Sequence, residues 1–110
     1  MDPARTKYKG RPVRPPVEAK AEQRFVKEAK AIGCLCRKLN GSGNRDWPDQ
    51  LCLVPGGAKL LFEFKREGKD LRPTQQAWHD KAADMDQVVY TVWGWAEALD
   101  IVEAHRCGRR

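Results

Sequence analysis

The residues best suited to chemistry in this chain are two carboxylates and a lysine in neighbouring segments. Asp49 follows Trp47-Pro48, and Glu63 and Lys65 stand two positions apart in an apolar run. Side chains alternate between the two faces of a strand, so Glu63 and Lys65 should point the same way. Alone they would indicate an ordinary ion pair at a strand edge. With Asp49 on the neighbouring strand, a divalent-metal site is the better interpretation, because buried charges need partners.

Such a site suits phosphodiester hydrolysis. That reaction needs an activated water, a neutralised phosphate and a stabilised leaving oxygen, and Mg²⁺ or Mn²⁺ held by oxygen ligands can supply all three. Asp49 and Glu63 are ligands of the right type, and the backbone carbonyl of Phe64 could complete the protein's share. Lys65 could orient or deprotonate the water, or hold the phosphate.

A further carboxylate could come from the first predicted helix. Residues 17–32 are strong helix formers, and Gly33 should end the helix. Glu18 and Glu22 lie on or beside its inward stripe, one turn apart, and either could reach the site. The stripe itself consists of Ala21, Phe25, Ala29 and Ile32.

The remaining elements predict an α/β fold. The Pro55-Gly56-Gly57-Ala58 turn favours a hairpin between the second and third strands. The order α-β-β-β-α-β-α implies a mixed central sheet flanked by helices. After the first helix we expect strands at 34–39, 51–54 and 59–65, a helix from Pro73 or Thr74 to about Met85, a strand at 88–93 and a helix at 95–104.

Length and composition indicate one globular domain. The chain has 110 residues, of which 41% are hydrophobic and 33% charged. We see no apolar run of membrane-spanning length and no apolar signal-peptide core, and therefore expect a cytosolic protein without a membrane partner.

The positive charge is concentrated at the two ends. The formal net charge is +6, and residues 17–105, the predicted domain, are close to neutral. Residues 1–16 form a proline-rich arm with five basic side chains, and residues 106–110 form a basic tail with three. These ends suit contact with phosphates, although solubilising tails would have the same composition.

The cysteines and histidines have simpler interpretations than metal binding. Cys34-Leu35-Cys36 is too tightly spaced for the usual zinc knuckle, so we expect the cysteines to act as small hydrophobic residues. A zinc-stabilised interaction module is the corresponding alternative. We expect His79 to be a surface or DNA-facing side chain, since the mechanism does not need it.

Together these residues resemble a known nuclease family. The order Glu22, Trp47-Pro48-Asp49, Glu63-Phe64-Lys65 and Gln75 is similar to the PD-(D/E)XK superfamily, and more narrowly to the small stand-alone VRR-NUC (virus-type replication-repair nuclease) domains of phages and bacteria. The likeness continues through FEFKREGKDLRPTQ and covers nearly all of the globular part. It implies a restriction-endonuclease-like αβββαβ core.

The resemblance also implies residue roles. Asp49 and Glu63 would bind Mg²⁺ or Mn²⁺ with the Phe64 carbonyl, Lys65 would be the catalytic lysine, and Gln75 would stand beside the site. Glu22 is the preferred helix carboxylate, with Glu18 as the alternative. The residues expected to contact nucleic acid are Lys38, Arg45, Arg66, Lys69, Arg11 and Arg14.

The implied activity is that of a metal-dependent, structure-selective DNA endonuclease of DNA repair. It would act on branched DNA, as Holliday-junction resolvases do, without an organic cofactor, and in the host cytosol if a phage encodes it. Related domains are homodimers, and exposed residues among Trp78, Trp93, Trp95 and Tyr90 could supply the dimer contact. The alternative is a non-catalytic DNA-binding or recombination accessory protein with the same fold.

Two positions depart from the family pattern. Asp46 and Asp86 stand where the family often has glycine. At position 46, aspartate can adopt the left-handed backbone conformation that a glycine there would use. Asp46 would also place a negative charge near the expected path of the phosphate.

Overall fold

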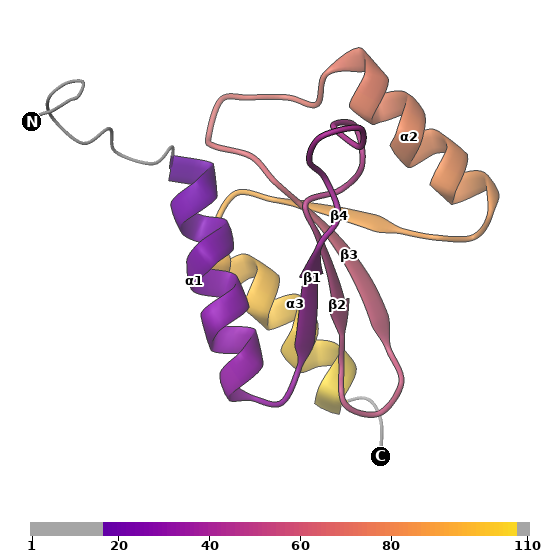
Figure 1. Cartoon of the computed structure of the whole chain (residues 1–110). Helices are drawn as coiled ribbons and strands as arrows, with labels where there is room; N and C mark the ends of the chain where they lie inside the picture. Colours follow the sequence, from indigo (N-terminus) through magenta and orange to yellow (C-terminus); the bar gives the residue numbers. More distant parts are fainter. Residues whose placement is uncertain (1–16, 108–110) are drawn as a thin grey trace, which may run out of the picture.

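A computed structural model describes residues 17–107 of the chain. The order of elements is the predicted one, α-β-β-β-α-β-α (Figure 1). The expected roles of Arg11, Arg14 and the arm at 1–16 lie outside the described residues, as does most of the basic tail. The elements are α1 (Val17–Ala31), β1 (Leu35–Lys38), β2 (Gln50–Leu53), β3 (Lys59–Phe64), α2 (Pro73–Asp84), β4 (Val89–Val92) and α3 (Trp95–Cys107).

The four strands form one mixed sheet in the order β1-β2-β3-β4. The β1–β2 and β2–β3 pairs are antiparallel, as the Pro55–Ala58 turn predicts, and the β3–β4 pair is parallel. Parallel neighbours need a crossover connection, which α2 supplies. The fold-class prediction of a mixed sheet with flanking helices is therefore confirmed.

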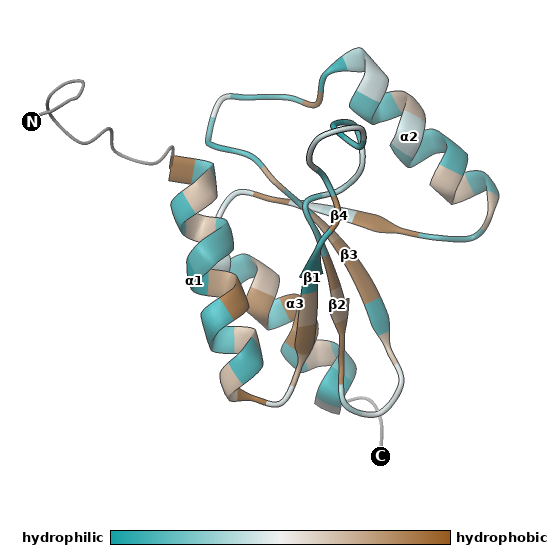
Figure 2. Ribbon diagram, viewed as in Figure 1, coloured by the Kyte–Doolittle hydropathy of each residue, from teal (hydrophilic) through white to brown (hydrophobic). Residues whose placement is uncertain are grey.

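The hydrophobic core lies between one face of the sheet and helices α1 and α3, which pack against each other. Phe25 of α1 is fully buried, and its ring contacts those of Phe62 and Phe64 on β3, with ring centroids 4.9 and 5.6 Å apart. Apolar residues dominate β2, β3 and β4, whereas much of α1 and α2 is hydrophilic (Figure 2). Cys34 and Cys52 belong to this core, as expected of small hydrophobic residues.

Some element boundaries differ from the prediction for local reasons. Cys34, expected to open the first strand, donates its backbone N–H to the Ala29 carbonyl at 3.0 Å and so closes the end of α1. Gly33 makes this closure possible with φ of 96°. The second strand begins one residue early, at Gln50, because Gln50 pairs with Phe62.

Asp86, which stands where the family often has glycine, has a left-handed backbone conformation with φ of 60°. It lies in the turn between α2 and β4, where the chain reverses to enter the sheet. Among residues 17–107 it is the only non-glycine residue with positive φ. Asp46, which also stands where the family often has glycine, does not have a positive φ.

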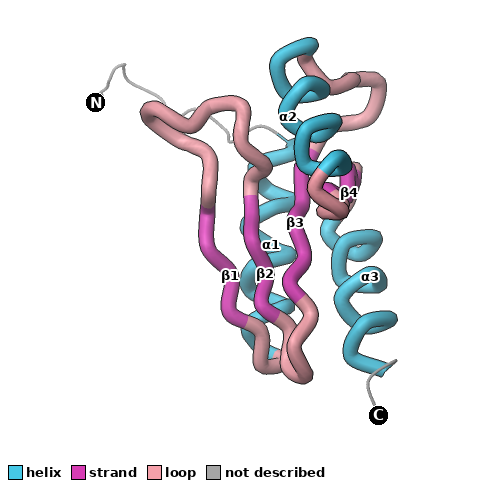
Figure 3. Tube along the Cα trace, turned by 90° about the vertical axis from the view of Figure 1, so that its right-hand side faces the viewer, coloured by secondary structure: helices cyan, strands magenta, loops and turns pink. Residues whose placement is uncertain are grey.

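Helix α2 lies beyond one end of the strands, away from α1 and α3 (Figure 3). It packs against β4 and leaves the end of β3 facing the start of α2. This end of the sheet also carries the loop between β1 and β2. No helix within 17–107 combines the length and apolar character needed to cross a membrane.

Candidate active site

One cavity at this end of the sheet collects most of the predicted site residues. It has a volume of about 200 Å³. The predicted residues that line it are Glu22, Arg45, Asp49, Glu63, Phe64, Lys65 and Gln75, and Glu18, Ala19, Asn40 and Arg72 complete the lining. Residues far apart in the sequence thus meet as the metal-site interpretation requires.

Antiparallel pairing places Asp49 opposite Glu63. Gln50 pairs with Phe62, so the residue before Gln50 faces the residue after Phe62. The Phe64 backbone N–H donates to Asp49 Oδ2 at 2.7 Å, and the Asn40 side-chain amide donates to Oδ1. Both oxygens of this buried carboxylate are therefore held in place.

Gln75 links the other two charged groups. Its Nε2 donates to Glu63 Oε2 at 3.2 Å, and its Oε1 accepts from Lys65 Nζ at 2.8 Å. The Arg72 backbone N–H also donates to Oε1, at 2.9 Å. Since Gln75 is 97% buried at the first turn of α2, its two polar ends fix the spacing of Glu63 and Lys65.

The two carboxyl groups are held in an unfavourable environment. Burial, followed by the neighbouring charge of Asp49, raises the pKa of Glu63 from 4.5 to about 8. Burial also raises the pKa of Asp49, against the hydrogen bond from Phe64. Such shifts mean that two negative charges at this point are costly unless a cation joins them.

His79, expected to be a surface or DNA-facing side chain, is largely buried and lies against Glu63. Its side chain is only 10% exposed, and Nε2 lies 3.9 Å from Glu63 Oε1. Burial lowers the pKa of His79, so the ring is neutral near pH 7. Within residues 17–107 neither His79 Nε2 nor Glu63 Oε1 has a hydrogen-bond partner. The helical spacing of Gln75 and His79, one turn apart, could have indicated this placement.

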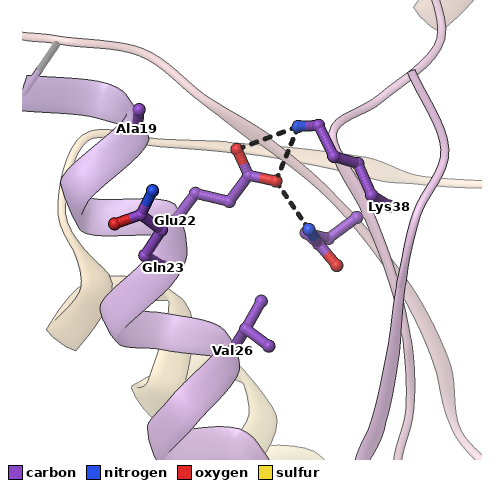
Figure 4. A pocket seen from close by; sticks show the side chains of 6 residues that line it. Ala19, Glu22, Gln23, Val26 and Lys38 are labelled. Carbon is purple, nitrogen blue, oxygen red and sulfur yellow. Dashed lines mark hydrogen bonds and ion pairs between the residues drawn. The ribbon is translucent and has the colours of Figure 1, made fainter. Parts of the chain in front are cut away.

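Glu22 reaches the site from α1 but is held by other partners. Its carboxylate accepts from Lys38 Nζ at 3.0 and 3.3 Å and from Gln50 Nε2 at 2.6 Å. Figure 4 shows the Glu22 carboxylate bonded to Lys38, and both residues line a second groove of about 450 Å³. Lys38, expected to face DNA, has a half-exposed side chain that forms this ion pair.

Glu18, the alternative helix carboxylate, lines the same cavity one turn earlier. In the described part of the chain its buried Oε1 has no hydrogen-bond partner. Both glutamates are therefore placed to serve the site, and the choice between them stays open.

The side chain of Asp46 is hydrogen-bonded to the start of α2. Its Oδ1 accepts from Thr74 Oγ1 at 2.8 Å and from Arg72 Nη2 at 3.3 Å. These hydrogen bonds, that from Thr74 first, lower the pKa of Asp46. The expected conflict with a phosphate is reduced because Arg72 balances the charge.

The basic residues are distributed unevenly around the cavity. Arg45 lines it, whereas Arg66 and Lys69 are exposed in the loop between β3 and α2. Arg72 was not predicted, although its position directly before the Pro73-Thr74 helix start places it at the site. Asn40, which orients Asp49, was also missed, because its role depends on contact between the two ends of the loop that joins β1 and β2.

The cavity fits a hard divalent cation, on the evidence of its oxygen groups. Asp49 and Glu63 lie opposite each other, and Glu63 Oε1 is buried without a partner in the described chain. Mg²⁺ is commonly bound by one or two carboxylates and keeps several waters. Within residues 17–107 no set of three or more His, Cys, Asp or Glu side chains is grouped to hold a metal. The protein's share would thus be a carboxylate pair.

The site and fold together define a mixed α/β domain with a buried acidic pair and a lysine at one end of its sheet. No family model matches the sequence, and no curated protein does. A solved structure described as a VRR_NUC domain matches with a TM-score of 0.70 and 24% sequence identity, over 81% of this chain and 97% of that one. The chain therefore has the fold of a VRR_NUC domain.

Proposed function

We propose that this chain is a Mg²⁺- or Mn²⁺-dependent endonuclease that hydrolyses phosphodiester bonds in branched DNA, in the manner of a Holliday-junction resolvase. The observation that carries the proposal is the convergence of Asp49, Glu63, Lys65 and Gln75 on one cavity. The likeness to a VRR_NUC domain supports it, because that description names a nuclease.

Each side chain has a role in this proposal. Asp49 and Glu63 bind the metal with the Phe64 carbonyl, and the metal supplies Lewis-acid chemistry to the phosphate and the attacking water. Lys65 Nζ, held by Gln75, orients the water or the phosphate. Glu22 or Glu18 adds a carboxylate from α1.

The substrate contacts follow from the charges around the cavity. Arg45 lies at its wall, and Arg66 and Lys69 extend from the loop that leaves β3. Lys38 and the arm residues Arg11 and Arg14 are proposed to extend the phosphate contacts. A homodimer would present two such sites to a branch of matching symmetry, and the measured mass in solution tests this state.

The test is cleavage of labelled four-way junctions, flaps and continuous duplex with Mg²⁺, Mn²⁺ or EDTA. Wild-type protein should cut at least one branched DNA with metal and none with EDTA. Glu63→Gln and Lys65→Ala should lose about 100-fold or more in rate. Lys59→Ala is the matched control, since Lys59 is an exposed lysine at the other end of β3.

Undiminished cutting by Glu63→Gln or Lys65→Ala would refute the proposed site. Metal-independent binding of branched DNA without any cutting would instead favour the non-catalytic accessory protein. Stoichiometric zinc in the purified protein would favour the interaction module.

A further inference from the structure

Two tryptophans on the elements that supply residues to the cavity have no part in the proposed hydrolysis. Trp47 lies between Arg45 and Asp49, both of which line the cavity, and it is 43% exposed. Its ring packs on that of Trp78, with centroids 5.2 Å apart and planes tilted by 51°. Trp78 follows Gln75, another lining residue, by almost one turn of α2. The Trp47–Trp78 pair therefore joins the loop that carries Arg45 and Asp49 to the helix that carries Gln75, all three of which line the cavity.

The loop that carries Trp47 is fixed to α2 by several hydrogen bonds. Asp46 accepts from Thr74 and Arg72, and Arg72 Nη2 also donates to the Arg45 carbonyl at 3.4 Å. Inside the loop, the Trp47 backbone N–H donates to the Asn44 carbonyl at 3.2 Å. Trp47 is thus presented by a braced loop, and a ligand would bind it at a low cost in conformational entropy.

The surroundings of this ring indicate the chemistry of its ligand. The exposed part of the Trp47 indole offers a flat π surface. Arg45 and Arg72 line the cavity, and Arg72 Nη2 bonds the two residues directly before Trp47. Flat apolar surface next to cationic groups suits a nucleobase with its phosphate. Within a continuous duplex both faces of each base are covered by neighbouring bases, so only an unstacked base can use the indole.

We infer that Trp47, supported by Trp78, stacks on an unpaired base next to the scissile phosphate and so selects DNA with a branch or frayed end over continuous duplex. The inference rests on the proposed nuclease function and names the feature of the substrate that the site reads. It assigns selectivity to one ring rather than to the metal site.

The test compares binding by Trp47→Leu and Trp47→Phe in a Glu63→Gln background with EDTA, so that no DNA is cut. The probes are a continuous duplex, the same duplex with an unpaired tail, and a four-way junction, each with 2-aminopurine at the branch point or the equivalent base. Loss of one base–aromatic stack should weaken binding of the tailed and junction DNAs about fivefold to 100-fold. Duplex binding should change less than twofold.

Controls separate stacking from folding and from assembly. Trp47→Phe keeps an aromatic face and should retain most of the selectivity. Leu53→Ala removes a side chain of similar exposure, 39%, at the opposite end of the sheet and should change nothing. Wild-type protein should quench 2-aminopurine at the branch point and Trp47→Leu should not, while both keep the same mass and a cooperative unfolding transition.

The outcomes distinguish this inference from the proposed function. Equal weakening on duplex and branched DNA, or no weakening, would overturn the stacking role even if wild-type protein cuts DNA. Selective binding that depends on Trp47 without any cutting by wild-type protein would sustain the stacking role and overturn the nuclease. A changed mass in Trp47→Leu would make Trp47 an interface between copies and overturn the inference, and absence of DNA binding would overturn both proposals.

Discussion

Replacing Glu63 by glutamine should stabilise the metal-free protein at alkaline pH while abolishing its activity. Glutamine has nearly the shape of glutamate but carries no charge at any pH. Glu63 is 98% buried, opposite Asp49, and its pKa is raised to about 8 by burial and by that neighbour. The substitution also relieves Asp49 of a nearby negative charge.

The size and direction of the effect follow from proton linkage. Between pH 4.5 and about pH 8, the folded protein keeps a proton on Glu63 that the unfolded chain has released. The free energy of unfolding of wild-type protein should therefore fall as the pH rises through this window, by at most about 1.4 kcal/mol per pH unit. Above the window, Glu63→Gln should be more stable than wild type by about 2 to 5 kcal/mol, the lower value applying if water in the cavity screens the charge.

Urea unfolding with EDTA, followed by tryptophan fluorescence, would measure this difference at about pH 5 and about pH 8.5. The two proteins should have nearly equal free energies of unfolding at the lower pH and differ at the higher one. Glu67→Gln is the control, because Glu67 is exposed in the loop after β3 and should show no such pH dependence.

Added Mg²⁺ gives a second comparison. Metal binding to the folded state should stabilise wild-type protein at pH 8.5 and have a much smaller effect on Glu63→Gln. If wild-type stability stays constant or rises between the two pH values relative to Glu63→Gln, the burial argument for this site is refuted.

Three further predictions test other parts of the structure. Phe25→Ala should lower the free energy of unfolding by about 3 to 5 kcal/mol, because Phe25 is fully buried. Val17→Ala, on the exposed surface of α1, should change it by less than about 0.5 kcal/mol. Urea unfolding measures both changes. Asp86→Gly should raise the free energy of unfolding by about 1 kcal/mol, since glycine adopts φ of 60° without strain; an unchanged or lower melting temperature would contradict this. Glu22→Gln should slow metal-dependent cutting about tenfold to 100-fold and Glu18→Gln less than threefold; the reverse order would assign the role to Glu18.

The order of elements could be predicted because local signals agree with the fold. Alternating and apolar runs mark the strands, Gly33 marks the end of α1, and Pro73 marks the start of α2. The antiparallel β2–β3 pair follows from the short Pro-Gly-Gly turn between them. Strand ends were less predictable, since Cys34 belongs to the helix end through a backbone hydrogen bond that has no sequence signature.

The site was partly predictable for a similar reason. Asp49, Glu63 and Lys65 are positioned by strand register, which sequence spacing and hairpin length constrain. Asn40 was not recognised, because its contact with Asp49 depends on how the two ends of a loop pack. His79 was missed although its position one helical turn after Gln75 could have indicated its placement. The side-chain hydrogen bonds of Asp46 to Thr74 and Arg72 were not predicted either, because they too depend on how the loop packs against α2.

The β2–β3 register has a consequence for how insertions and deletions can accumulate in this protein. The Pro55–Ala58 turn lies at the opposite end of the hairpin from the cavity (Figure 1). A slip of β2 by one residue would bring Gln50 to the position opposite Glu63 in place of Asp49 and exchange an acid for an amide. Changes in turn length should therefore persist only where the added residues loop out at the tip, so a tag or dye placed between Gly56 and Gly57 should leave the carboxylate pair intact.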